Sequence, residues 1–101
     1  MTSPGNLDVE KALDELPDQV AEALTNWRIA TLNREKFEAL LYSRFKGTHF
    51  GITSIEIKAL INQDNERYDY VLNEIKAEAD YKRLEERLMA IKKRAALRTH
   101  Y

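Results

Sequence analysis

The sequence predicts an all-α protein in which a long helix, a glycine-containing bend with a short helix, and a second long helix form a helical hairpin that self-associates. Three observations support this fold class. Apolar residues recur at steps of three and four along most of the chain, and neither Gly nor Pro follows Gly51. The chain also combines 33% charged with 44% hydrophobic residues, which suits a folded helical protein better than a disordered one.

A chain of 101 residues holds at most one domain. We therefore expect a single helical domain over residues 1–101, built from four parts. These are an acidic, frayed N-terminal segment (1–16), a helix (17–46), a bend with a short helix (47–64) and a long helix (65–98).

Local signals set the expected helix ends. Pro17 fits the first turn of a helix, where its missing N–H costs no hydrogen bond, and Gly47 fits the position just after a helix C-terminus. Thr53 and Glu56 form the Thr-x-x-Glu pattern of a capping box, which predicts that the short helix begins there. Asp64 offers an N-cap for the last helix.

The last helix carries a heptad seam, because its apolar residues from Tyr81 to Ala95 are spaced alternately by three and four positions. This seam would pack on the 17–46 helix or on another protomer. A two-helix hairpin cannot cover both the seam and the apolar face that bears Trp27 and Phe37, so we expect a homo-oligomer. The residues expected at its interface are Trp27, Phe37, Tyr81, Leu84, Leu88 and Ile91.

Composition argues against catalysis, metal binding and cofactors. The chain has no Cys and only two His, at positions 49 and 100, so it lacks the usual ligands of a zinc site. It also lacks Gly-rich phosphate-binding motifs and the His-Glu-x-x-His motif. We therefore expect no enzyme activity, no metal and no cofactor.

Targeting signals are missing from the sequence as well. The N-terminus lacks the basic and apolar regions of a signal peptide, and no apolar run approaches the length of a membrane span. The absence of Cys fits a reducing compartment. We therefore expect a cytoplasmic protein without a membrane partner.

Charge is unevenly distributed, although the formal net charge is only −1. The stretch ALLYSRFKGTHFGITS around the bend contains bases and aromatic residues and no acid. Tyr42, Phe45 and Phe50 could stack on unpaired bases while Arg44 and Lys46 reach phosphates. Equally, the three aromatic residues could close the core under the bend. The sequence leaves both interpretations open.

A second basic stretch, from Arg87 to the C-terminus, has five bases and no acid. Such bases complement the C-terminal dipole of a helix. Five of them exceed what capping needs, so we expect a surface for an anionic partner. The full set of expected nucleic-acid-binding residues is Arg34, Lys36, Tyr42, Arg44, Phe45, Lys46, Arg87, Lys92, Lys93, Arg94 and Arg98.

Three stretches, EKFEALLYSRFKG, IEIKALINQD and ERLMAIKKRAALRTHY, follow one pattern. A base-containing helix ends in Tyr-Ser before a glycine bend, a short segment with Lys and Leu leads to an Asp, and a last helix closes in Leu-x-Ala-x-Lys-x-Arg. In this pattern about two-thirds of the chain, from residue 34 onward, resembles the UvsY-like recombination mediator proteins of bacteriophages.

The resemblance implies an oligomer that organises single-stranded DNA so that a RecA-type recombinase can displace a single-strand-binding protein. In that family, bases just before the tyrosine contribute to DNA binding. Lys36 matches the first of them, whereas Glu38 is an acid two residues further on.

We therefore expect a recombination mediator that binds single-stranded DNA as a homo-oligomer, with a recombinase and a single-strand-binding protein as partners. The alternatives are a phage structural or assembly adaptor and a small protein–protein inhibitor, neither of which binds DNA.

Overall fold

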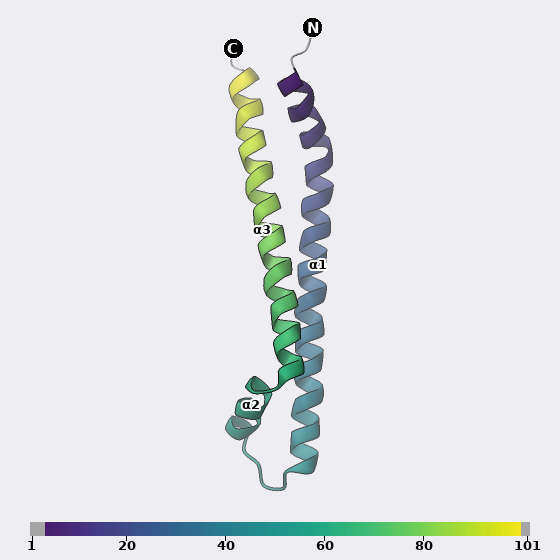
Figure 1. Ribbon diagram of the computed structural model, residues 1–101, viewed down its shortest axis with the longest axis vertical. Coiled ribbons are helices and arrows are strands. Elements are labelled where there is room, and N and C mark those ends of the chain that lie inside the picture. The colour runs from purple at the N-terminus through teal and green to yellow at the C-terminus, as the bar shows by residue number, and fades with distance from the viewer. Residues whose placement is uncertain (1–3, 100–101) are drawn as a thin grey trace. The chain divides into compact units, whose positions relative to one another are not determined.

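The computed structural model describes residues 4–99, with side chains for residues 9–97. Three helices and no strand occur in that range: α1 (Pro4–Thr48), α2 (Ser54–Asn62) and α3 (Asn65–Thr99) (Figure 1). The predicted all-α class, with its order of long helix, bend with short helix and long helix, is confirmed.

The chain divides into two compact units, each of which contains part of α1 and part of α3. Unit 1 comprises Met1–Asn26 and Ala77–Tyr101, and unit 2 comprises Trp27–Lys76. In each unit the two long helices pack against each other, and α2 belongs to unit 2.

In unit 1, the first part of α1 packs against the last part of α3. Val9, Leu16 and Ile91 form the buried cluster, and Leu84 and Leu88 pack against it. The heptad seam of α3 is therefore covered within the chain, by the segment for which the sequence predicted a frayed end. Three residues predicted for an oligomer interface, Leu84, Leu88 and Ile91, are used in this packing.

Helix α1 runs through Pro17, whereas the sequence predicted that a helix begins there. Inside a helix, Pro removes one backbone hydrogen bond and costs about 3 kcal/mol. Leu16, directly before it, is 3% exposed, and Val9 is 9% exposed. Since burial of one such side chain contributes about 2 kcal/mol, packing on α3 offsets the cost of the proline and keeps the preceding residues helical.

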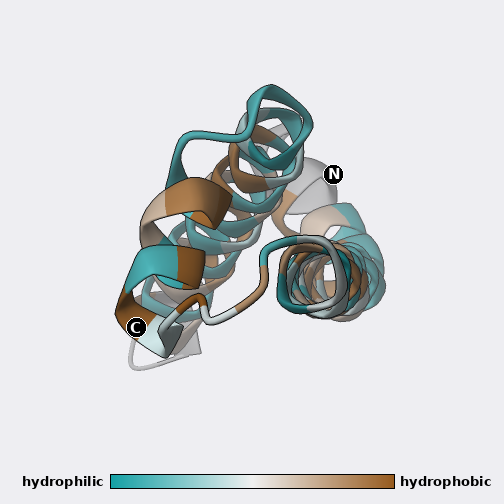
Figure 2. Cartoon of the chain, turned by 90° about the horizontal axis from the view of Figure 1, so that it is seen from below, coloured by the Kyte–Doolittle hydropathy of each residue, from teal (hydrophilic) through white to brown (hydrophobic). Residues whose placement is uncertain are grey.

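In unit 2, α2 packs against α1. Leu41 and Ile57 are each 1% exposed and form, with Ile61, the cluster called here the bend core. The chain carries hydrophobic and hydrophilic residues side by side along its helices (Figure 2), and in α2 the buried ones are Ile57 and Ile61 of the bend core. The side chains packed around the bend core are Phe37, Tyr42, Phe45 and Ile52.

Two predicted helix starts are confirmed. The Thr53 side chain accepts a hydrogen bond from the backbone N–H of Glu56 at 3.2 Å and caps α2. Asp64 Oδ1 accepts from the backbone N–H of Arg67 at 3.0 Å, directly before α3. Each cap satisfies a backbone donor that the first turn of a helix leaves without a partner.

The predicted end of the first helix at Gly47 was wrong, because α1 continues to Thr48. The Thr48 hydroxyl donates to the backbone carbonyl of Arg44 at 2.8 Å, and the N–H of His49 donates to the carbonyl of Phe45 at 2.9 Å. These bonds extend the helical pattern past Gly47. The left-handed backbone of the bend lies at Gly51, with φ 77°, where the absence of Cβ avoids strain.

The bend core makes a direct prediction for stability. Ile57→Ala should lower the free energy of unfolding by about 2–5 kcal/mol, because it leaves a cavity against Leu41. Ile55 lies two residues earlier on α2 and is 81% exposed, so Ile55→Ala is the matched control and should cost less than about 0.5 kcal/mol. Urea unfolding followed by circular dichroism measures both variants. Equal losses would contradict the assigned buried side of α2.

Candidate nucleic-acid interface

The bend between α1 and α2 presents the exposed side chains of Arg44, Lys46, His49 and Phe50, called here the bend surface. Phe50 is 109% exposed, so its ring projects fully into solvent. An aromatic ring in water is a favourable contact for a partner with a flat apolar face, because covering the ring removes apolar area from water. Arg44 and Lys46, which are exposed on the same stretch, would attract an anionic partner.

Tyr42 and Phe45, the other aromatic residues of this stretch, pack against the bend core. The Tyr42 hydroxyl lies 3.4 Å from Ser54 Oγ, and Lys46 Nζ lies 5.9 Å from the centroid of the Tyr42 ring. The Phe45 ring meets the His49 ring edge-on, with centroids 5.7 Å apart. Both residues therefore support the bend from inside, and their stacking on bases stays a prediction.

Four alternating charges link α1 to α3 in unit 2. Glu38 accepts hydrogen bonds from Arg34 Nη1 at 3.1 Å and from Arg67 Nε at 2.9 Å. Arg34 also donates, through Nε, to the Glu74 carboxylate. The four side chains are only 21–25% exposed, and their charges balance. We call these four residues the charge network.

The charge network shifts two pKa values. Burial raises the pKa of Glu38, but the hydrogen bonds and positive charges of Arg67 and Arg34 outweigh this effect, so the pKa lies below its ordinary value of 4.5. The hydrogen bond to Glu74 raises the pKa of Arg34. Arg34, predicted to bind nucleic acid, is therefore a cation whose charge is already compensated inside the chain.

The network was missed by sequence reasoning, although one signal was present. Arg34 and Glu38 are four residues apart, a spacing that brings side chains together on a helix. Their contacts with Arg67 and Glu74 depend on the register of α1 against α3, which one sequence does not define. Glu38 thus has a structural role at the position where the UvsY-like pattern has a base.

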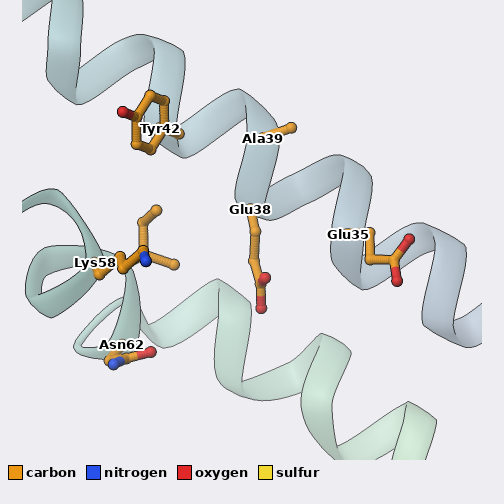
Figure 3. Close-up of a pocket in the computed structure, with 7 residues that line it drawn as sticks. Glu35, Glu38, Ala39, Tyr42, Lys58 and Asn62 are labelled. Carbon is orange, nitrogen blue, oxygen red and sulfur yellow. The ribbon is translucent and has the colours of Figure 1, made fainter. Parts of the chain in front are cut away.

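A groove of about 480 Å³ lies next to the charge network (Figure 3). Glu35, Glu38 and Tyr42 line it from α1, and Lys58 and Asn62 line it from α2. Glu38 extends from α1 toward α3, where Arg67 meets it. Arg34 and Arg67 compensate the charge of Glu38, and the remaining charges of the lining, Glu35 and Lys58, balance each other. Because the groove has no excess of positive charge to attract a phosphate, we do not assign it to a nucleic-acid surface.

The basic residues near the end of α3 are exposed in unit 1 and are called here the terminal patch; Lys92 lies about 160° around the helix from Arg94. Its described members are Arg87, Lys92, Lys93 and Arg94, and none of these four has an ion pair among the described residues. Arg87 and Arg94 lie two helical turns apart and share one side of α3. The side chain of Arg98 lies outside the described ones. The four cations are thus available to an anion.

The remaining predicted residues have different surroundings. Lys36 is exposed on α1. Phe37 stacks on Tyr70 of α3, with ring centroids 4.7 Å apart, so this predicted interface residue is used inside unit 2. Trp27 and Tyr81 are half-buried, and both interact within the chain. Their predicted roles in self-association stay predictions.

Within residues 4–99, no cluster of acidic or His side chains is suited to hold a metal ion, and no helix combines the length and apolarity that crossing a bilayer requires.

Comparisons of the chain with known protein families, characterised proteins and solved structures give no match. The fold and its surfaces define a helical-hairpin protein with a basic, aromatic bend, and the resemblance to UvsY-like proteins stays a prediction.

The lowered pKa of Glu38 predicts how stability depends on pH. The ionised carboxylate stabilises the fold above the unfolded-state pKa, and this contribution is lost as pH falls through the lower folded-state pKa. Glu38→Gln should therefore destabilise the protein at neutral pH, and its deficit relative to wild type should shrink on acidification to about pH 3.

Urea midpoints measured across this pH range test the prediction. Glu35→Gln is the matched control, because Glu35 is exposed on the same helix and has no ion pair among the described residues. It should follow the wild-type profile. A constant deficit for Glu38→Gln at every pH would show that the charge of Glu38 does not stabilise the fold.

Proposed function

We propose that the chain binds single-stranded DNA through its bend surface, without catalysis, and acts as a recombination mediator of the UvsY-like kind. One observation carries the proposal. Phe50 is a fully exposed aromatic ring on a surface with Arg44 and Lys46, and no acid occurs between residues 39 and 54.

The chemistry of this surface suits an unpaired strand. Every base has a flat face on which an aromatic ring can stack, and that face is accessible only when the base leaves a duplex. Cations on the same surface neutralise backbone phosphates without reading the sequence. The bend surface supplies both kinds of contact, so the proposed binding tolerates any base sequence.

The terminal patch supports the same partner. Its four exposed cations have no ion pairs among the described residues, and Arg87 and Arg94, on one side of α3, offer a second surface for phosphates. In a homo-oligomer both surfaces would be repeated, and binding by several copies to one strand raises the overall affinity without any new contact. This multivalency compensates for a net charge of only −1 per chain.

The finer role of mediator is supported by the resemblance to the UvsY-like pattern. In that role the oligomer holds the strand while a RecA-type recombinase replaces a single-strand-binding protein, so these two proteins are the implied partners.

A different observation favours a second candidate, a structural or assembly adaptor. Nine large hydrophobic side chains are exposed among the described ones, and where such side chains lie together they mark a surface that packs against another protein. In that case the cations of the bend surface would pair with acids of another subunit, and no strand would bind.

The bend cations predict a specific salt dependence. Removing Arg44 and Lys46 together by Ala substitution should weaken binding to labelled oligo-dT and make the log–log salt slope shallower by about 0.7 for each phosphate that is no longer neutralised. Fluorescence anisotropy over a salt series measures both effects. Lys76→Ala, which removes an exposed cation from α3, is the control and should leave the slope unchanged. If the double variant binds like wild type, Arg44 and Lys46 do not contribute to strand binding.

Phe50 predicts a decrease in affinity without a decrease in stability. Phe50→Ala should weaken binding by about 1–3 kcal/mol because the variant cannot stack on a base, with the salt slope and melting temperature unchanged because the ring is fully exposed. Phe45→Ala is the comparison, since it removes a ring packed on the bend core and should lower the melting temperature. Wild-type affinity for Phe50→Ala would favour the adaptor.

A further inference from the structure

His49 is the residue of the bend surface whose side-chain type changes charge near neutral pH. A histidine ring takes up a proton between about pH 8 and pH 5, whereas Arg and Lys side chains stay positive throughout this range. The His49 ring is exposed, and the stretch from residue 39 to 54 contains no acid. The number of positive charges on the bend surface therefore depends on the protonation of His49.

Four contacts hold His49 in place. Its backbone N–H donates to the Phe45 carbonyl at 2.9 Å, and its backbone carbonyl accepts from the N–H of Ile52 at 3.3 Å. The His49 and Phe45 rings meet edge-on, with their planes at 72°. Ring atom Nδ1 lies 2.9 Å from the Thr48 hydroxyl oxygen. These contacts restrict the rotation of an exposed ring, so the fold sets the direction of its other nitrogen, Nε2.

The Thr48 hydroxyl determines which nitrogen of the neutral His49 ring carries the proton. A hydroxyl has one proton to donate, and that of Thr48 goes to the Arg44 carbonyl at 2.8 Å. The hydroxyl oxygen therefore accepts from His49, so Nδ1 carries the ring proton and donates it. Nε2 is then an acceptor to which no described residue is hydrogen-bonded. A neutral His49 ring thus offers a phosphate oxygen no donor at Nε2.

Protonation reverses the chemistry at Nε2. Both nitrogens of an imidazolium are donors, so Nδ1–H keeps its bond to Thr48 while Nε2–H becomes a charged donor. This donor lies on the same surface as Arg44 and Lys46 and suits a charge-assisted hydrogen bond to a phosphate oxygen. Conversely, a bound phosphate favours the protonated ring, because the binding of the proton and of the anion are linked.

The acids of the neighbouring elements do not neutralise the ring. Among the described residues no acid forms an ion pair with His49. A Glu56 carboxylate oxygen accepts from the Thr53 hydroxyl at 3.1 Å, and Asp64 caps α3. The charged and titratable side chains of the elements around the bend are Tyr42, Arg44 and Lys46 on α1, Glu56 and Lys58 on α2, and Asp64, Glu66 and Arg67 at the start of α3.

We propose that His49 is a further phosphate-binding residue of the bend surface, and that only its protonated ring makes the contact, through Nε2–H. The chain would then bind an unpaired strand more tightly as the pH falls from about 8 to about 5.5. This inference rests on the proposed binding of single-stranded DNA. It adds a dependence on pH that Arg44, Lys46 and Phe50 do not supply.

Fluorescence anisotropy with labelled oligo-dT, over a salt series at each pH, tests the role of His49. One further neutralised phosphate steepens the log–log salt slope by about 0.7, which corresponds to roughly fivefold tighter binding at about 0.1 M salt. Wild type should show both changes at the lower pH. His49→Gln should show neither, because an amide does not titrate in this range. His100→Gln, which changes the other histidine of the chain, is the matched control and should keep the wild-type response.

The outcomes separate this inference from the proposed function. A strand that binds wild type equally well at both pH values, or a His49→Gln variant that keeps the pH response, would overturn the role of His49 and leave strand binding intact. Absence of strand binding at either pH would contradict the proposed function and the role of His49 with it. NMR of the ring nitrogens at about pH 8, without the strand, tests the geometry separately. The ring proton of His49 should be on Nδ1, and a proton on Nε2 would overturn the proposal.

Discussion

A pair of helices can bury only one side of each helix, and the rest of this structure depends on that constraint. In unit 2 the buried side supplies three core residues, Leu41, Ile57 and Ile61, and the charge network beside them. The short helix α2 adds to this core because Thr53 and Asp64 cap its start and the start of α3. Every other apolar side chain of the unit is left partly or fully in contact with water.

The surfaces that this constraint leaves exposed have separate proposed uses. Arg44, Lys46 and Phe50 lie at the bend, whereas exposed apolar side chains such as Leu32 and Ile75 lie along the long helices. The residues of the two surfaces do not overlap, so one chain can hold a strand and a neighbouring copy at the same time. Assembly would then multiply the bend surface, which a chain with almost no net charge needs in order to bind a polyanion.

Local signals in the sequence were sufficient for the fold class and for both caps, because spacing and capping depend on residues that are near in sequence. The break at Pro17 was predicted wrongly, since packing of Leu16 on α3 outweighs the local cost of the proline. The predicted helix end at Gly47 was also wrong, because hydrogen bonds extend α1 past this residue. The left-handed conformation occurs at Gly51 instead.

The candidate site was harder to predict, because burial depends on contacts between distant segments. Tyr42, Phe45 and Phe50 look alike in the sequence, yet two pack on the bend core and one is fully exposed. From the sequence alone, Arg34 looks like a cation that is available to a phosphate. The register of α1 against α3 places Glu74 beside it, and the two side chains form an ion pair.

The chain is proposed to bind an unpaired strand as a homo-oligomer. Size-exclusion chromatography with light scattering, run with and without labelled oligo-dT, tests this central claim most directly. We expect an oligomer in the absence of the strand, and a strand that elutes with the oligomer at low salt and is released at high salt. A monomer that elutes apart from the strand at low salt would contradict the claim.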